Sequence, residues 1–258
     1  MNFIKKYYNN LNYDQKESLR VIKNSFWKIN WIKTLWFNCK TLPFSKAIRC
    51  PVIIAYNTKI KNAGKIVFTN DIYPAMVSLG VIRLSAFETT SNPLIFNNRG
   101  TLEIGGRLKI HPGAVFSIVK GATIKVGNHV GIGASSKIIC RKSITFGNDV
   151  RCSWNTQLLD SDFHFLYNIE KDKYYPRTKE IVISNNVFIG NGCTIAKGTI
   201  LPDGCVVSCI SKVSGDFTME GENLLIAGNP AKVIKKGINI SSGWFPEKER
   251  EIAKLMEE

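Results

Sequence analysis

Three histidines, His111, His129 and His164, are the only imidazole side chains in this chain of 258 residues. Acidic residues closely precede His164, because it ends the run Asp160-Ser-Asp-Phe-His. A nearby carboxylate can hold an imidazole in one tautomer and raise its basicity, as a general base requires. His164 is therefore the candidate catalytic base, with Asp160 and Asp162 as its candidate partners. The alternative is a solvated loop histidine without a chemical role.

A regular pattern surrounds this motif and must position it. Downstream, six-residue steps begin with the aliphatics Ile183, Ile189, Ile195, Leu201, Val207 and Val213. A fixed short period is typical of a solenoid, because a single repeat cannot bury its own apolar face. Cys193 and Cys205 occupy small interior positions in these steps, where a thiol behaves as a small hydrophobe.

The same spacing continues upstream, with three gaps of eight residues instead of six. Grouped in threes, the positions predict five coils, at 104/110/118, 126/132/138, 146/152/158, 183/189/195 and 201/207/213. Three short strands per coil make a triangular prism, an all-β solenoid with its aliphatic side chains stacked inside. A β-sandwich with coincidental spacing is the alternative, which the unbroken run of steps disfavours.

Composition divides the chain further. We expect a basic aromatic helical segment over residues 1–50, irregular early strands over 51–100, the regular prism over 101–215 and a C-terminal extension with a short helix over 216–258. A polar, aromatic insertion at 160–182 interrupts the prism, and such loops on rigid solenoids usually carry function. The insertion contains His164, whereas the other two histidines lie within the repeats.

Positive charge is concentrated near the N-terminus. The chain has a formal charge of +15, and residues 1–70 contribute 13 Lys and Arg against two acidic residues. Trp27, Trp31 and Trp36 alternate with lysines there. Such a segment can contact an anionic membrane, through residues 1–40, or pack its aromatics on the prism or on a neighbouring subunit. No nucleic-acid-binding motif accompanies the charge, so we expect no nucleic-acid partner.

Metal chemistry and secretion are not expected. The three histidines are separated by 18 and 35 residues, which does not suit a shared zinc site. Seven cysteines without a CxxC pair indicate reduced thiols in a cytoplasmic protein. We find no signal peptide and no apolar run of 18 residues, so we expect a cytoplasmic protein. Peripheral contact with the inner face of the membrane is compatible with this location.

Four segments together give the chain a specific resemblance. They are Thr34-Leu-Trp-Phe-Asn-Cys-Lys-Thr-Leu-Pro-Phe, Asp160-Ser-Asp-Phe-His, Ile183-Ser-Asn-Asn-Val-Phe-Ile-Gly and Ile226-Ala-Gly-Asn-Pro-Ala-Lys-Val-Ile. Over about residues 34–237 the chain resembles the hexapeptide-repeat acyltransferases, and within them the sugar O-acetyltransferases of capsule and lipopolysaccharide gene clusters. The resemblance implies a left-handed parallel β-helix that forms a homotrimer, with acetyl-CoA and a saccharide acceptor bound between neighbouring prisms.

The resemblance also assigns roles to residues. His164 would take the proton from a sugar hydroxyl, which then attacks the thioester of acetyl-CoA, and Asp160 or Asp162 would orient it or bind the acceptor. Trp154 and Asn155 would line the acceptor site. The cofactor residues would be Phe188, Gly190, Lys197, Ser208, Cys209, Lys212, Asn229, Pro230 and Lys232. Phe188 replaces the usual Trp, and Ser208 and Cys209 replace the usual Gly-Ala pair.

Three functions are compatible with these features. The first is acetyl-CoA-dependent O-acetylation of a saccharide in surface polysaccharide biosynthesis. The second is N-acetylation of an amino sugar, or acylation of serine, with nearly the same His164 chemistry. The third is a non-catalytic β-helix that acts as a scaffold or binding module.

Overall fold

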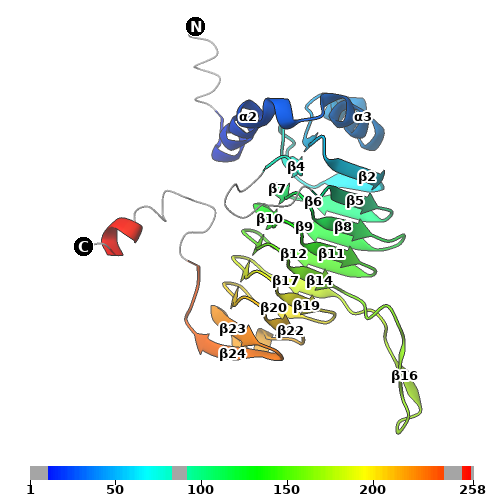
Figure 1. Ribbon diagram of the computed structural model, residues 1–258, viewed down its shortest axis with the longest axis vertical. Coiled ribbons are helices and arrows are strands. Elements are labelled where there is room, and N and C mark those ends of the chain that lie inside the picture. The colour runs from blue at the N-terminus through cyan, green and yellow to red at the C-terminus, as the bar shows by residue number, and fades with distance from the viewer. Residues whose placement is uncertain (1–10, 83–91, 241–251, 257–258) are drawn as a thin grey trace.

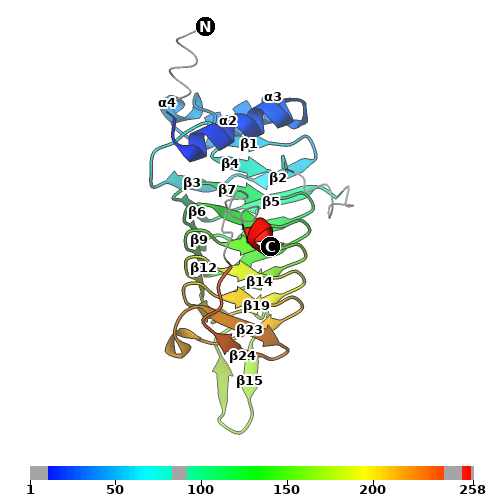
Figure 2. The same ribbon diagram turned by 90° about the vertical axis from the view of Figure 1, so that its left-hand side faces the viewer.

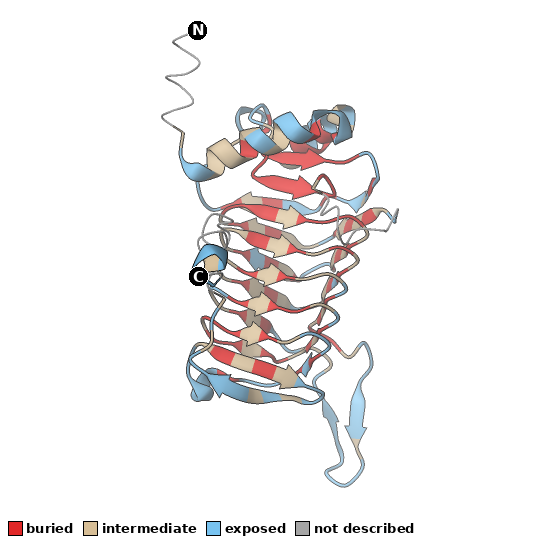
Figure 3. Ribbon diagram, turned by 60° about the vertical axis from the view of Figure 1, so that its left-hand side comes forward, coloured by how far each residue is buried: buried red, intermediate tan, exposed pale blue. Residues whose placement is uncertain are grey.

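The chain forms a column of stacked parallel strands with helices across its N-terminal end (Figure 1). The computed structural model describes residues 11–82, 92–240 and 252–256. Figure 2 shows the strands repeating along the column like rungs, and Figure 3 shows that the buried residues follow its interior. A hairpin projects from the side of the column near its C-terminal end.

Three sheets form the walls of the prism. The nine-stranded sheet contains β1 (Val52–Ile54), β4 (Val77–Leu79), β7 (Leu108–Ile110), β10 (Val130–Ile132), β13 (Arg151–Cys152), β18 (Phe188–Ile189), β21 (Val206–Val207), β23 (Leu224–Gly228) and β24 (Ala231–Lys236). The seven-stranded sheet contains β2 (Thr58–Asn62), β5 (Leu94–Asn98), β8 (Val115–Ile118), β11 (Lys137–Cys140), β14 (Gln157–Leu159), β19 (Thr194–Ala196) and β22 (Lys212–Val213). The six-stranded sheet contains β3 (Lys65–Phe68), β6 (Thr101–Ile104), β9 (Thr123–Val126), β12 (Ser143–Phe146), β17 (Ile181–Ile183) and β20 (Ile200–Leu201).

The strand register confirms the predicted solenoid. In the six-stranded sheet, Val126 pairs with Ile104 on one side and with Phe146 on the other, and Ile183 pairs with Phe146 and Leu201. These side chains are buried in one continuous core, as are the interior thiols of Cys193 and Cys205. The same three sheets take in β1 to β5, from the segment expected to hold irregular strands, of which residues 83–91 lie outside the described residues.

One predicted register is wrong. Ile118 pairs with Cys140, and Ile138 pairs instead with Phe116. Strands β8 and β11 each turn two residues inward, and all four of these side chains are buried. A spacing rule that follows one aliphatic per strand cannot tell which of the two inward positions pairs with the next coil.

Helices close the N-terminal end of the prism, as the sequence predicts, in α2 (Tyr13–Ser25), the 3₁₀ turn η1 (Phe26–Lys28), α3 (Trp31–Thr41) and α4 (Phe44–Ala47). Asn12 and Asn30 accept backbone N–H bonds at the starts of α2 and α3, which satisfies donors that a helix start leaves free. Residues 1–10 of the expected helical segment lie outside the described residues.

Helix α3 supplies the end strand β1 with hydrogen-bond partners. Asn38 donates to the carbonyl of Val52 at 2.7 Å and accepts from its N–H at 3.1 Å, and the Thr34 hydroxyl accepts from the N–H of Ile54 at 3.1 Å. Both side chains are buried. These bonds cover the first edge of the nine-stranded sheet, which would otherwise present unpaired backbone groups.

Helix α2 is fastened to the side of the prism by an ionic contact. His129 lies between two carboxylates: its Nε2 is 2.6 Å from Asp14 Oδ1, and its Nδ1 is 3.0 Å from Asp149 Oδ1. Asn128 also donates to Asp14, and Arg107 lies 3.8 Å from it. Burial acts to lower the pKa of His129, but the hydrogen bonds and charges of Asp14 and Asp149 outweigh it and raise that pKa above 6.5.

This contact predicts a pH-dependent stability. A histidine whose pKa is raised by folding stabilises the protein fully below its unfolded pKa of 6.5, and the contribution is lost as the pH rises through the folded pKa. We expect wild type to exceed His129→Asn by about 2 kcal/mol in unfolding free energy near pH 6, and by less near pH 9. Denaturant unfolding at both pH values measures this. An advantage that stays constant with pH would contradict the contact.

The C-terminal end of the prism is formed by the antiparallel pair β23 and β24. Beyond it, residues 252–256 are helical, which confirms the short C-terminal helix, while residues 241–251 lie outside the described residues. Within the described residues, no helix has the length and apolar character needed to span a membrane.

Candidate active site

The insertion leaves the prism at the end of strand β14 and is held tightly at its root. Ser161 and Thr178 form an antiparallel bridge. The N–H of Asp162 donates to the carbonyl of Arg177 at 3.0 Å, and the N–H of Lys179 donates to the backbone carbonyl of Asp160 at 3.0 Å. Two chain segments therefore leave the prism side by side. The root is fixed relative to the coils above and below it.

Asp160 does not face His164, which corrects its predicted role. Its side chain is fully buried and accepts the backbone N–H groups of Arg141, Lys142 and Ser143 at 2.7, 2.7 and 2.9 Å. These donors belong to the corner of the preceding coil, between β11 and β12. Asp160 therefore stabilises that corner, and neither the His164 ring nor an acceptor sugar can reach it.

Asp162 is about one third exposed and forms an ion pair with Lys197, which also donates to the carbonyl of Pro176 at 2.6 Å. Lys197 follows strand β19, one coil beyond the root of the insertion. Two residues predicted for different tasks, one beside the base and one beside the cofactor, are thus in contact. Together they brace the root of the insertion, and Asp162 is the carboxylate left near His164 in sequence and exposed to solvent.

His164 projects from the insertion into solvent. It follows Phe163, whose backbone has φ of 65° and whose N–H donates to the Ser161 hydroxyl at 3.0 Å. Among the described residues, none forms a hydrogen bond or ion pair to the His164 ring, which is exposed. A basic lone pair of this ring is therefore accessible to a substrate, as a general base requires.

Beyond His164 the insertion forms an antiparallel hairpin of β15 (Leu166–Asn168) and β16 (Lys173–Tyr175). Its aromatic side chains contact one another: Phe165 and Tyr174 at 6.4 Å, Tyr167 and Tyr174 at 4.9 Å between ring centroids. All of them are largely exposed, and Ile169 at the tip is 85% exposed. The hairpin stands clear of the prism (Figure 1). The sequence indicated a functional loop but did not predict this ordered apolar arm.

The predicted acceptor residues lie at another edge of the prism. Trp154 and Asn155 form the corner before strand β14, whereas His164 follows that strand. Six residues of extended chain separate Trp154 from Asp160, a distance of about 20 Å. One prism therefore does not bring Trp154 and Asn155 together with His164.

Most predicted cofactor residues share the corner of Trp154. The N–H of Gly192 donates to the carbonyl of Trp154 at 3.1 Å, so the corners stack, and Phe188 and Gly190 precede this one. Ser208 and Cys209 form the next corner along the prism. Asn229 and Pro230 form the turn between β23 and β24 at the same edge, where the N–H of Gly228 donates to the Ser211 hydroxyl.

Close packing between coils explains why position 190 is a glycine. A Cβ atom there would lie 2.7 Å from the backbone nitrogen of Cys209, closer than atoms tolerate. The glycine is therefore required where one corner stacks on the next. Its type at this position does not by itself identify a cofactor site.

Lysines supply positive charge near this edge. Lys212 begins strand β22, and Lys232 lies on strand β24 beside an open hollow of about 560 Å³. Lys236, also at this hollow, is paired with Glu220 at 3.2 Å, while Lys232 and Lys235 are exposed. The hollow can accept an anionic group such as a phosphate.

His129 is the histidine that lies between two carboxylates, and sequence spacing missed it because Asp14 is 115 residues away. It is poorly placed to act as a base. Both of its ring nitrogens face carboxylates, which raise its pKa by favouring the charged ring with a proton on each nitrogen. A ring held in this way has no free lone pair with which to accept a proton. Across the described residues, no three His, Cys, Asp or Glu side chains are placed to hold a metal ion together.

Comparison with known proteins decides the family. A protein from the cps region of Klebsiella pneumoniae, named only as uncharacterised, is 34% identical over 203 residues, which cover 78% of this chain and 86% of that protein. A polysialic acid O-acetyltransferase of Escherichia coli is 32% identical over 120 residues, or 46% of this chain and 38% of that enzyme. The chain is a hexapeptide-repeat acyltransferase.

A solved structure supports the fold of this acyltransferase. The crystal structure of the polySia-specific acetyltransferase NeuO matches with a TM-score of 0.54 and 24% identity, over 79% of this chain and 88% of NeuO. The predicted fold, a left-handed parallel β-helix with N-terminal helices and a short C-terminal helix, is confirmed. No family model matches the chain.

Proposed function

We propose that this acyltransferase transfers an acetyl group from acetyl-CoA to a hydroxyl group of a saccharide during surface polysaccharide biosynthesis. The observation that carries the proposal is His164: an exposed imidazole on a braced root, in the insertion that interrupts the coils of an acyltransferase β-helix between β14 and β17. The relative that acts on polysialic acid and the relative from a cps region support a saccharide acceptor. The expected reduced thiols and the use of acetyl-CoA favour a cytoplasmic location.

The proposed reaction needs one base and one oxyanion site. His164 accepts the proton of the acceptor hydroxyl while the oxygen attacks the thioester carbonyl carbon. The carbon–sulfur bond then breaks, and the proton on His164 passes to the departing CoA sulfur, so that ester and free thiol are the products. Backbone N–H groups would stabilise the oxyanion, and holding both substrates in line would supply much of the rate. No acyl-enzyme is required.

A homotrimer would complete this site. The root of the insertion that carries His164 lies about 20 Å along the chain from the edge that carries Trp154, Phe188 and Cys209. A neighbouring copy that packs with its Trp154 edge against the insertion would bring the two sets together. The aromatic hairpin supports this arrangement, since large apolar side chains that are exposed together on one element often mark a contact with another chain. Acetyl-CoA would then lie in the groove between copies, with Lys212 and Lys232 near its phosphates.

Acetyl-CoA binding and acetyl transfer test the proposal directly. Acetyl-CoA at about 100 times its dissociation constant should stabilise the full-length protein by about 2.7 kcal/mol, seen as a higher unfolding temperature. Light scattering should give three times the chain mass of 28.9 kDa. Mass spectrometry should detect acetylated products on hydroxyl-bearing oligosaccharides.

Other outcomes of these measurements favour the alternatives. Transfer to an amino sugar or to serine, with no transfer to hydroxyl-only saccharides, would replace O-acetylation by the second function. Absence of any stabilisation at millimolar acetyl-CoA would favour a non-catalytic scaffold. A monomer with full transfer activity would contradict the composite site.

A further inference from the structure

Helix α3 carries apolar residues on two opposite faces, and only one face is used by the fold. Thr34, Phe37 and Asn38 are buried against the first strands of the prism. Ile32, Leu35 and Trp36, on the outward face, are 84%, 51% and 47% exposed. Positions i, i+3 and i+4 form one stripe on a helix, so these three side chains are neighbours. The outward stripe is therefore left largely exposed to solvent.

The helices that close the N-terminal end of the prism, α2, η1, α3 and α4, form a cap, and other elements of this cap enlarge the apolar surface. Trp27, on the turn η1, is 89% exposed, and Phe44 and Ile48, at α4, are 76% and 62% exposed. Trp31, by contrast, packs against a buried cluster under the helices. The aromatic residues of this segment therefore divide into packing residues and outward residues. Large exposed apolar surfaces on soluble proteins usually mark contact sites.

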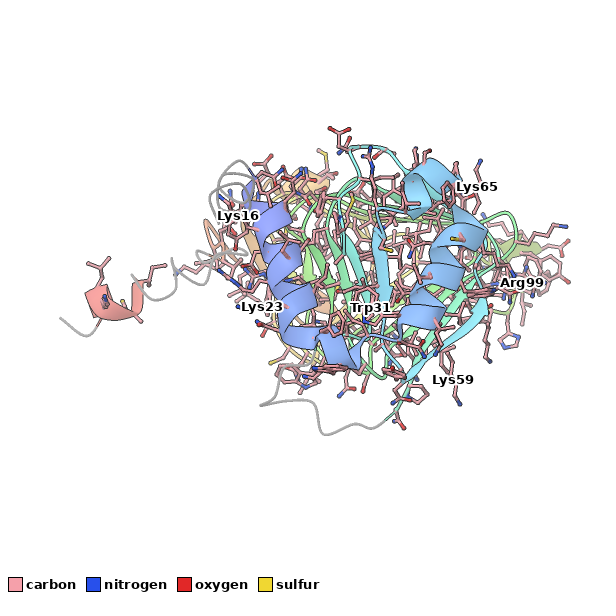
Figure 4. All side chains as sticks on the ribbon, turned by 90° about the horizontal axis from the view of Figure 1, so that it is seen from above. Lys16, Lys23, Trp31, Lys59, Lys65 and Arg99 are labelled. Carbon is pink, nitrogen blue, oxygen red and sulfur yellow. The ribbon has the colours of Figure 1, made fainter. Side chains whose placement is uncertain are left out.

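The same end of the molecule is strongly basic. Residues 11–65 contain 11 Lys and Arg but only two acidic residues, Asp14 and Glu17. Asp14 is bound to His129 and Glu17 to Arg20, so neither leaves an unpaired negative charge on the cap. Besides Arg20, which pairs with Glu17, the exposed basic residues are Lys23, Lys28, Lys40, Lys46, Arg49, Lys59, Lys61 and Lys65. Figure 4 looks down on this end and shows Lys23, Lys59 and Lys65 around its margin.

A small hollow adjoins the outward stripe. It has a volume of about 240 Å³ and is lined by residues that include Trp36, Lys40 and Lys61. The Lys40 ammonium lies 4.9 Å from the centre of the Trp36 ring. An aromatic ring with an ammonium group against it, and a second lysine at the same hollow, suits the boundary between acyl chains and anionic headgroups, where tryptophan and lysine are favoured.

We propose that the outward face of this cap docks on an anionic lipid bilayer. Interleaved tryptophan, isoleucine and lysine side chains match an interface that is apolar below its headgroups and negatively charged at its surface. A second copy is a poorer occupant. Face-to-face pairing would bring two basic surfaces together, and the opposite end of the prism, with exposed Lys232 and Lys235, is basic too.

The proposed trimer would strengthen this docking, a point that rests on the proposed function. If the three prisms are parallel, their caps face one plane and bind the bilayer together, which multiplies weak contacts into a stable one. The insertion and its His164 would then lie along the side of an enzyme standing on the membrane. That position suits an acceptor saccharide attached to a lipid.

Vesicle flotation tests the docking. Full-length protein should float with phosphatidylcholine vesicles that contain phosphatidylglycerol, should stay behind with phosphatidylcholine alone, and should be released by high salt. Lys28→Glu should weaken partitioning by more than about fivefold, the value of one lysine at such a surface. Trp27→Ser combined with Ile32→Ser should abolish flotation. Both sites are exposed, so folding should be unaffected.

Matched controls lie far from the cap. Lys120→Glu changes net charge equally at a mid-prism corner, and Met219→Ser removes a side chain that is 95% exposed near the other end. Both should float like wild type. The proposal would be overturned if the wild-type protein does not float with anionic vesicles at low salt, or if the cap variants float as wild type does. A larger assembly that Trp27→Ser dissolves would also overturn it, because the occupant would then be a second copy.

The same samples separate this inference from the proposed function. Acetyl-CoA stabilisation and transfer to a soluble saccharide should be unchanged in the cap variants, because the cap contains none of the candidate site residues. Loss of flotation with full transfer supports the docking surface. Flotation without any transfer would leave the docking intact and contradict the proposed reaction.

Discussion

Replacement of His164 by alanine should lower the acetyl-transfer rate by about 10²- to 10⁴-fold, the usual contribution of a general base. The ring is exposed and no described residue hydrogen-bonds to it, so the unfolding temperature should stay within about 1 °C of wild type. Acetyl-CoA binding should be retained, because the acyl donor would contact the neighbouring edge. Initial-rate kinetics with a saccharide acceptor, together with thermal unfolding, measure both effects.

A second histidine provides the matched control. His129→Asn removes the imidazole between Asp14 and Asp149, which fastens helix α2 to the prism. It should lower stability near pH 6 and leave the rate constant of acetyl transfer at wild-type level. Near-normal turnover by the His164→Ala enzyme would exclude His164 as the base. Loss of turnover in His129→Asn at a temperature where it is folded would move the chemistry to the α2 contact.

Replacement of Asp160 by asparagine should destabilise the protein by about 3 kcal/mol, because a buried carboxylate that accepts three backbone N–H groups becomes an amide with two donors of its own. One amide hydrogen would then point at a backbone N–H. For a chain of this size the unfolding temperature should fall by roughly 6–12 °C. Thermal unfolding measures the loss.

Asp162→Asn is the control for this second substitution. Asp162 is two residues away, lies one third exposed and pairs with Lys197, so its replacement should cost about 1 kcal/mol or less. Any effect should fall on turnover, through the position of the insertion's root. Equal losses of stability in the two variants would refute the assignment of Asp160 to the coil corner. Normal stability with low turnover in Asp160→Asn would instead support the predicted role of Asp160 in the active site.

The solenoid could be predicted from sequence because its signal is local. Each inward aliphatic is followed by the next at a fixed distance, and a strand that gains two residues keeps its inward face. The interruption between Leu158 and Ile183 marked the insertion for the same reason. The exchange of Ile118 for Phe116 opposite Ile138 escaped prediction, because both side chains point inward.

The candidate site was harder to predict because its contacts are distant in sequence. Asp160 and Asp162 stand two apart beside His164, yet one faces the preceding coil and the other Lys197 in the following coil. Residues two apart on an extended chain lie on the same face, so alternation alone would give the two side chains one neighbour, and no motif shows that each meets a different one. The residues at the Trp154 edge are divided from His164 by the width of a sheet, a separation that appears only once the coils are assembled.

The contact between Asp14 and His129 has a consequence for how this column comes apart. Coils of a solenoid touch only their neighbours, so such structures usually fray one coil at a time from either end. Helix α2 reaches past the first strands to the corners before β10 and β13, and ties the N-terminal end to the middle of the column. Opening at that end must therefore release several coils together. Amide hydrogens should exchange with solvent earliest near β22 to β24, where no helix of the described residues ties several coils together, and the column should unfold from the end farthest from its cap.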